Sequence, residues 1–487
     1  MAHSAPDSRR WWALFLLCTA QFIVILDTSI VGVALPFIQR ALDLSQANLQ
    51  WVFNAYVIAF GGLLLLGGRL ADLFGQRRLF MLGFGILSAA ALVTGLAQSS
   101  GILFAGRAVM GLGAALIAPA ALSLVIGLFA ANPPEMGKAL GFWGASAAAG
   151  GTAGVFLGGV ITQWLSWRWT FLVNIPLGLL VLLAAPLLLR PGLIRRGAVD
   201  IAGALAVTGS LVLAVYAIVT ANTAGWGSFR TIGLLFVAVA LLAVFVAIQV
   251  NRHEPLVPLR IFGTPNLATG NVVMALLGGA WIPLWFFLNL YLQQVLGFGA
   301  FASGSALLPM TVTIMVLMVG VTGRVIGRFG FRPVLVVGLL LLAGALLLFA
   351  RAPMGGGFVA DVLPASLIAA IGMSLSFIPA IIAGTANARP EEAGLASGLI
   401  NTTYQVGSAL GLAAMTAVAT AYTTHRLNAG TAPLPALNAG FHAAFVGAAA
   451  IALVGAMIAI VSLRQPRPVT TETAPDVAHR ELLAETD

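Results

Sequence analysis

Long apolar stretches recur along the whole chain, separated by short segments rich in charged residues, glycine and proline. A membrane-spanning helix needs about 20 mostly apolar residues, and each stretch approaches or exceeds that length. The pattern therefore predicts an all-α integral membrane protein with fourteen transmembrane helices. Their predicted ranges are 11–35, 50–68, 79–97, 102–129, 139–161, 169–189, 199–220, 231–250, 266–291, 301–322, 334–350, 360–384, 394–420 and 441–463.

Composition narrows the class of protein further. Of the 487 residues, 60% are hydrophobic and 8% charged, whereas a soluble domain carries about 25% charged residues. This balance excludes a soluble enzyme, a disordered scaffold and, despite the net charge of +9, a nucleic-acid partner. The single cysteine, Cys18, excludes a disulfide framework and a cysteine metal site. No soluble segment is long enough for a nucleotide-binding domain, so we expect no cofactor, no metal and no ATP-driven transport.

The basic residues sort to alternate loops of this topology. With the N-terminus in the cytoplasm, 18 of the 24 lie on the cytoplasmic side, five lie outside, and Arg107 lies within a span. Basic residues accumulate in cytoplasmic loops, so we expect a multi-pass protein of the inner (cytoplasmic) membrane with both termini cytoplasmic. The polar tail after Arg464 is expected to be disordered.

An internal repeat divides the chain. The loop Gly68–Arg78 returns as Gly323–Pro333, at an offset of 255 residues, and Pro119-Ala120 has a counterpart in Pro379-Ala380. The repeat predicts two pseudo-symmetric six-helix halves and two inserted helices, an architecture typical of alternating-access transporters. The predicted units are 1–190 (first half), 191–260 (inserted helices and linkers), 261–463 (second half) and 464–487 (tail).

Four motifs in order carry a family resemblance. The loop Gly68–Arg78 resembles the cytoplasmic loop signature of the major facilitator superfamily, and Leu26–Pro36 (LDTSIVGVALP), Arg107–Gly113 and Trp167–Gly178 are similar to span signatures of its fourteen-span drug:proton antiporter branch. The resemblance implies the major-facilitator fold and multidrug efflux driven by a proton gradient, and with it antibiotic resistance. One position departs from the exporter signature of the fifth span, because Val155 stands where a proline usually follows Gly154, and this weakens the assignment of antiport from that motif.

Asp27 and Arg107 are the strongest candidates for proton coupling. Asp27 is a carboxylate well inside a predicted span, where acids are costly and commonly functional. Because burial disfavours the charged form, we expect Asp27 to exchange a proton as a cavity opens to either side. From the rise of an α-helix, Arg107 lies roughly 7 Å and Asp27 roughly 12 Å from the outer end of their spans. An arginine side chain bridges that difference, so we expect an ion pair; the alternatives are an acid bonded only to its neighbours and an arginine that reaches the interface.

Two further motifs suggest moving parts. In the resembled family the loop after the second span helps to lock one conformation, which implies a gating role for Gly68, Arg69, Asp72, Gly75, Arg77 and Arg78; the alternative for Asp72 is a local salt bridge. The fifth span carries small residues at a spacing of four, which let a neighbouring helix approach closely. Two roles remain open for these small residues: packing alone, or packing together with sliding of the halves. The antiporter-motif residues are Gly150, Gly154, Gly158 and Gly159.

Aromatic and amide side chains on three predicted spans are candidates for a substrate pocket. Such groups suit a wide, weakly polar site for lipophilic or cationic ligands, although membrane tryptophans and amides often serve only as anchors or helix contacts. The candidates are Asn54, Tyr56, Trp281, Trp285, Asn289, Asn401, Tyr404 and Gln405.

We therefore expect a monomeric secondary transporter, surrounded by membrane lipids, that exports lipophilic small molecules in exchange for protons. Three alternatives remain open: an exporter dedicated to one endogenous metabolite, an uptake symporter, and a membrane-embedded sensor or enzyme. The last lacks the large soluble domain or the intramembrane catalytic dyad that it would need. The two inserted helices carry no intramembrane charge, and we expect them to act as scaffold.

Overall fold

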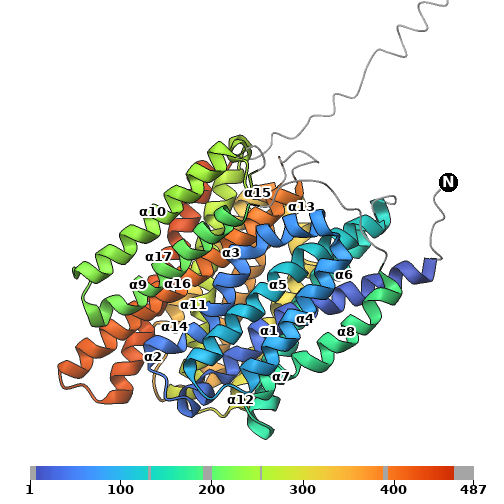
Figure 1. Cartoon of the computed structure of the whole chain (residues 1–487). Helices are drawn as coiled ribbons and strands as arrows, with labels where there is room; N and C mark the ends of the chain where they lie inside the picture. Colours follow the sequence, from blue (N-terminus) through green and yellow to red (C-terminus); the bar gives the residue numbers. More distant parts are fainter. Residues whose placement is uncertain are drawn as a thin grey trace, which may run out of the picture.

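The chain forms a bundle of long, nearly parallel helices (Figure 1). The computed structural model describes residues 7–129, 133–189, 200–252, 255–385, 387 and 393–464. Within them, fourteen helices are long and apolar enough to cross a membrane, which confirms the predicted number. Each overlaps a predicted span, because the apolar stretches that membranes require are also long enough to close all backbone hydrogen bonds internally. The bounds differ most at the last two helices: Ala393–Asn428 continues eight residues past the predicted end at 420, and Pro433–Ser462 begins eight residues before the predicted start at 441.

The first half consists of six spans and two short helices. The spans are α1 (Asp7–Ala41), α3 (Trp51–Phe74), α4 (Gln76–Gly95), α5 (Ser100–Phe129), α6 (Pro133–Trp164) and α8 (Asn174–Leu188), and the short helices are α2 (Gln46–Leu49) and α7 (Trp169–Leu172). The inserted pair is α9 (Ile201–Ala224) and α10 (Phe229–Asn251).

The second half repeats this plan. Its spans are α11 (Leu267–Leu290), α12 (Ala300–Gly320), α14 (Phe331–Phe349), α15 (Leu363–Thr385), α16 (Ala393–Asn428) and α17 (Pro433–Ser462). Shorter elements accompany them: a 3₁₀ turn η1 (Leu259–Gly263), two π-helical turns, η2 (Tyr291–Val295) and η3 (Phe358–Val362), and the helix α13 (Thr322–Phe329).

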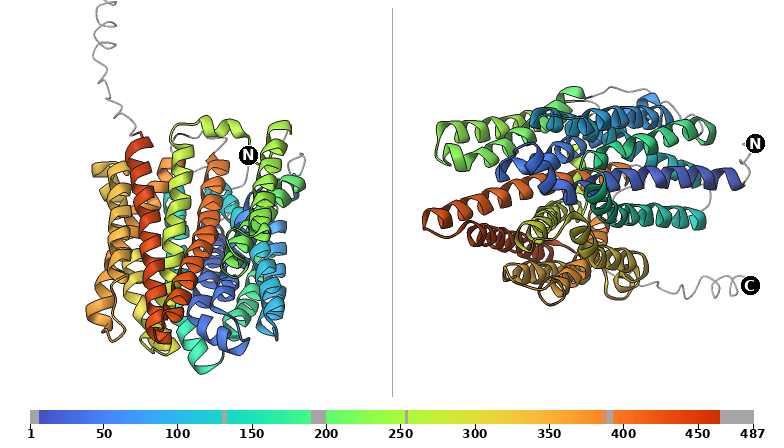
Figure 2. Two further views of the ribbon diagram at one scale, coloured as in Figure 1. Left: turned by 90° about the vertical axis from the view of Figure 1, so that its left-hand side faces the viewer. Right: turned by 90° about the horizontal axis from the view of Figure 1, so that it is seen from below.

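The contacts between helices have the same pattern in both halves. α1 packs along α6 as α11 packs along α16, and α4 contacts α5 and α8 as α14 contacts α15 and α17. Seen from below, the helices of the two halves gather on opposite sides of the bundle (Figure 2). The repeat extends to the backbone, since Gly75 and Gly330, 255 residues apart, both adopt positive φ, at 93° and 81°. Few residues other than glycine accept this conformation, so the same sharp turn links two helices in each half.

The bundle has two faces, named here by residues that lie on them. The Ala41 face holds the end of α1, the end of α6 and the start of α12. The Gly75 face holds the loop between α3 and α4, the starts of α1 and α6 and the end of α12. The halves meet where α3 runs along α16 and α6 runs along α12. At the Ala41 end of the second contact, a Cβ on Gly159 would lie 2.9 Å from the main-chain oxygen of Ala300. Small residues thus allow the two backbones to touch.

The inserted helices lie at one edge of the bundle (Figure 2). α9 contacts α10, α3 and α16, so this pair spans both halves. The buried carboxylate of Asp200 accepts hydrogen bonds from the backbone N–H of Gly203 (2.9 Å) and from Nε2 of Gln249 (2.7 Å). The Oε1 of Gln249 accepts from the backbone N–H of Val257 at 3.0 Å. Helices α9 and α10 are therefore fastened to each other and to the segment that leads into α11.

Candidate functional site

A fully buried ion pair lies between α1 and α5. Nη1 of Arg107 lies 2.6 Å from Oδ2 of Asp27, and both side chains are 0% exposed. The structure thus confirms the contact that the depths of the two residues in their helices predict. A charge-assisted hydrogen bond of this length is among the strongest in proteins, and removal of either partner would leave an uncompensated charge inside the membrane-spanning bundle.

Two aromatic rings and a main-chain carbonyl surround the guanidinium of Arg107. Its Nε donates to the oxygen of Val52 at 2.9 Å. Its Cζ lies 4.4 Å from the ring centre of Tyr56 and 5.6 Å from that of Phe171. Cation–π attraction compensates part of the lost hydration of the cation. Within the described part of the chain, Nη2 of Arg107 and the hydroxyl of Tyr56 have no hydrogen-bond partner, although both are buried.

Asn174 is the third polar residue of the site. It begins α8, and its Nδ2 donates to Oδ1 of Asp27 at 2.9 Å and to the oxygen of Phe171 at 3.2 Å. The sequence places Asn174 in the motif Trp167–Gly178 but gives no reason to connect it with Asp27. The sequence shows only that an amide stands at the start of an apolar span. Its contact with Asp27, 147 residues away in sequence, depends on the packing of α8 against α1.

The small residues of α6 allow that helix to approach α1 beside Asp27. A Cβ on Gly150 would lie 2.6 Å from the oxygen of Phe22, one on Gly154 would lie 2.7 Å from Cβ of Ser29, and one on Gly158 would lie 2.7 Å from the oxygen of Ile30. Gly159 faces the other way, toward α12 of the second half. Because α6 contacts α1 on one side and α12 on the other, the predicted antiporter-motif helix connects the neighbourhood of Asp27 to the interface between the halves.

The predicted gating loop lies on the Gly75 face. α3 continues through Gly68, which packs near Pro119, and Arg69, which is partly buried, and ends at Phe74. Arg77 donates to the oxygen of Leu189 at 3.1 Å, beyond the end of α8, and Arg78 is exposed. The side chain of Asp72 lies outside the described residues. In the second half the corresponding segment forms a separate helix, α13.

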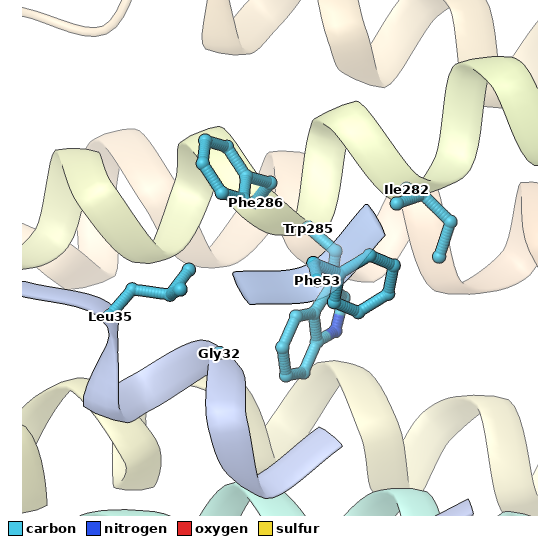
Figure 3. A pocket seen from close by; sticks show the side chains of 6 residues that line it. All are labelled: Gly32, Leu35, Phe53, Ile282, Trp285 and Phe286. Atoms are coloured by element: carbon cyan, nitrogen blue, oxygen red, sulfur yellow. The ribbon is translucent and has the colours of Figure 1, made fainter. Parts of the chain in front are cut away.

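The eight candidates for a substrate pocket have different surroundings. Trp285 lines a cavity of about 20 Å³ with Gly32, Leu35, Phe53, Ile282 and Phe286 (Figure 3), a volume that holds about one water molecule. The others lie elsewhere. Tyr56 stacks on Arg107, Asn54 donates to Gln50 at 3.3 Å, Asn289 donates to the oxygen of Trp285 at 3.0 Å, and Trp281 is buried. On α16, Tyr404 packs against Phe377, Gln405 lies against Gly61 of α3, and Asn401 is exposed.

Polar and aromatic contacts close the bundle at the Ala41 face. The Nε2 atoms of Gln293 and Gln294, in the π-helical turn η2, donate to the oxygen of Val33 (3.0 Å) and to Oε1 of Gln39 (2.9 Å) in α1. The ring of Trp164 in α6 lies 5.1 Å from that of Phe301 in α12. Each contact joins an element of the first half to one of the second. The two halves are therefore held together at the Ala41 face. Among the described side chains, no group of three or more metal-ligating residues occurs.

The fold and the buried polar site define a multi-pass membrane transporter rather than an enzyme. The chain belongs to the Major Facilitator Superfamily, which it matches over residues 17–412. It is 37% identical to the puromycin resistance protein pur8 of Streptomyces alboniger, over 97% of this chain and 95% of that protein. It is also 37% identical to the cephamycin export protein CmcT of Amycolatopsis lactamdurans, over 96% and 94% of the two chains. The fold is similar to that of the POT family transporter PepTSo, with a TM-score of 0.67 at 16% identity over 92% of this chain and 98% of that chain.

Proposed function

We propose that the protein exports lipophilic, often cationic, small molecules across the cytoplasmic membrane in exchange for protons. The observation that carries the proposal is the fully buried ion pair of Asp27 and Arg107, 2.6 Å apart, in a chain that crosses the membrane fourteen times. Two relatives named for antibiotic resistance or export support the direction of transport and the kind of substrate. Under this proposal the Ala41 face is extracellular, both termini are cytoplasmic, and the protein acts as a monomer.

The chemistry follows from the competition for one carboxylate. Arg107 pairs with Asp27 while the site is shielded from solvent. A proton that neutralises Asp27 removes the attraction between the two, and a cationic substrate that approaches the carboxylate competes with Arg107. A proton and a substrate therefore exclude each other at Asp27, which is the requirement for antiport. The proton gradient across the membrane is the only energy source that this mechanism uses.

Movement of the halves would give Asp27 access to either side. α6 touches α1 at Asp27 and α12 across the interface through its glycines, so sliding of α6 would move the site and the interface together. The arginines of the loop at the Gly75 face would hold the cytoplasmic ends of the helices in one of the two states. We further propose that residues 1–190 and 261–463 move as the two halves and that 191–260 connects them.

Proton flux in inverted membrane vesicles tests the proposal. Vesicles are acidified inside, a panel of lipophilic cations and antibiotics is added, and a pH-sensitive dye reports loss of the gradient. We expect a substrate-induced loss in the wild type that Asp27→Asn abolishes. Asp43→Asn is the matched control, because Asp43 is exposed and its positive φ of 49° is one that asparagine accepts.

Two results would contradict the proposal. A response that survives in Asp27→Asn would show that another group carries the proton. Dependence of transport on ATP in vesicles without a proton gradient would show that the energy source is a different one. A response to a single compound in the panel would instead indicate an exporter dedicated to one substrate.

A further inference from the structure

The two oxygens of the Asp27 carboxylate are held by two chemically different donors. Nη1 of Arg107 lies 2.6 Å from Oδ2, and Nδ2 of Asn174 lies 2.9 Å from Oδ1. Asn174 is itself fully buried at the start of α8. The proposed function uses the ion pair alone and leaves Asn174 without a part.

The amide of Asn174 has one end in use and one end free. Nδ2 donates to Asp27 and to the oxygen of Phe171, whereas Oδ1 is buried and has no partner among the described atoms. A side-chain amide carries two donors at one end and an acceptor at the other, and a guanidinium carries donors only. Of the two residues bound to Asp27, only Asn174 is therefore able to accept a hydrogen bond.

This difference determines where a proton fits. A proton on Oδ2 would face Nη1 of Arg107, which has no lone pair to receive it. A proton on Oδ1 would face Asn174, whose amide presents Oδ1 to the acid after a half turn about its terminal bond. That turn gives up the hydrogen bonds that Nδ2 makes to the ionised carboxylate and to Phe171.

We propose that Asn174 is a positioning residue that sets the pH at which Asp27 takes up its proton. Its amide binds the ionised carboxylate through Nδ2 and turns to accept from the protonated acid through Oδ1. This inference rests on the proposed function, since it assumes that Asp27 is the group that exchanges the proton. Atoms balance in the step, because one proton adds to Oδ1 of Asp27 and no covalent bond to Asn174 forms.

Few other ionisable groups face Asp27. The elements packed against α1 are α2, α3, α5, α6, α7, α8, α11 and α12, and η2 bonds to it through Gln293 and Gln294. η2 carries Tyr291, whose hydroxyl donates to the main-chain oxygen of Pro353 at 2.7 Å. On α1 itself, Cys18 and Arg40 lie nine and thirteen residues from Asp27. Tyr56 of α3 and Arg107 of α5 lie at the site. α6 contributes Glu135, which pairs with Arg10, and the exposed Lys138, both in its first two turns. α3 also carries Arg69 and Asp72 near its other end, and the sequences of α2, α7, α8, α11 and α12 hold no Asp, Glu, His, Lys, Arg, Tyr or Cys.

Infrared spectroscopy of the full-length protein in lipid tests the inference without a substrate. The carbonyl stretch of a protonated carboxylic acid is followed as the pH is lowered, and the band of Asp27 is the one that Asp27→Asn removes. Asn174→Leu keeps the branched shape of the side chain, with a somewhat larger volume, and removes its hydrogen bonds. Asn174→Leu removes a bond to each form of the acid: the donor to the ionised carboxylate and the acceptor for the protonated one. The bond to the charged form is about twice as strong as a neutral one, so the ionised form loses more and Asp27 binds the proton more tightly. We expect the midpoint of the band to move to higher pH by about one unit, a tenfold change in proton affinity.

Two more variants separate this role from general loosening of the bundle. Asn271→Leu is the matched control, since Asn271 is also a buried amide that donates to a main-chain oxygen, at 2.8 Å, and bonds one neighbouring side chain, Thr403. We expect it to leave the Asp27 midpoint in place. Asn174→Ser keeps a group that both donates and accepts, and we expect a smaller shift than with leucine.

The outcomes are distinguishable. The inference is wrong if Asn174→Leu leaves the midpoint unchanged, or if Asn271→Leu moves it equally. It is also wrong if the carbonyl band of protonated Asp27 stays at the same wavenumber in Asn174→Leu, because loss of the acceptor should raise it. If the wild type shows no band that Asp27→Asn removes, Asp27 takes up no proton, and the proposed function fails together with the inference.

Discussion

The indole ring of Trp285, in α11, lies directly against the backbone of Gly32, in α1, where a Cβ would collide with the ring. The two residues belong to different halves, and both line the small cavity (Figure 3). Gly32 is five residues beyond Asp27, or about 7.5 Å along the helix. The contact therefore closes the bundle between the buried carboxylate and the Ala41 face.

Replacement of Gly32 by alanine should disturb this closure. The added methyl group displaces the ring of Trp285, and overpacking of this kind costs about 1–3 kcal/mol. We expect Gly32→Ala to reduce substrate-induced proton flux in vesicles and the double variant Gly32→Ala/Trp285→Leu to recover part of it. Gly151→Ala is the control, because its nearest neighbour would be 3.8 Å from the new Cβ. Full activity of Gly32→Ala would argue against a tight contact.

Removal of Arg107 alone should destabilise the protein more than removal of Arg107 and Asp27 together. Arg107→Leu leaves the Asp27 carboxylate buried and unpaired, which costs about 3–5 kcal/mol. We expect a large fall in the thermal unfolding midpoint in detergent, and a recovery in Asp27→Leu/Arg107→Leu, which removes both charges. An Arg107→Leu protein with the wild-type midpoint would show that the variant holds no buried, unpaired charge at Asp27.

The glycines of α6 should differ in their tolerance of a side chain. Gly154→Ala and Gly158→Ala place a methyl group 2.7 Å from α1, so we expect each to lower stability by about 1–3 kcal/mol and to reduce transport. Gly144→Ala lies on the same helix with nothing within 4 Å, and alanine there should be neutral or mildly stabilising. The thermal unfolding midpoint and vesicle transport are measured for all three variants. Equal midpoints and equal transport in the three would contradict the prediction.

The glycine turns of the two repeats should respond alike. Gly75 and Gly330 have φ of 93° and 81° with ψ of 129° and 162°, a region that costs other residues about 1–3 kcal/mol. We expect Gly75→Ala and Gly330→Ala to lower the unfolding midpoint to a similar degree. Gly85→Ala, inside α4 with open space around it, serves as the reference. A fall in one variant and none in the other would mean that the two turns do not bear the same strain.

Much of the fold follows from the sequence without tertiary information. The fourteen spans could be predicted because the hydrocarbon core fixes the length and polarity of each crossing segment. The repeated loop predicts the repeated turn at Gly75 and Gly330, because glycine is the residue that accepts its backbone angles. The ion pair of Asp27 and Arg107 was also predictable, since both are charged residues inside spans and charges there require partners.

The tertiary structure alone decides what else meets Asp27. Asn174 and Tyr56 are uncharged, and nothing in their local sequence shows which helix faces them, because helix rotation depends on packing of all the neighbours. The same holds for Trp285, for which the sequence predicts a place on one helix face, whereas its contact with Gly32 depends on how the two halves approach each other. Membrane thickness and charge thus determine which segments cross and which residues need partners. Close packing of small and large side chains determines which partners they find.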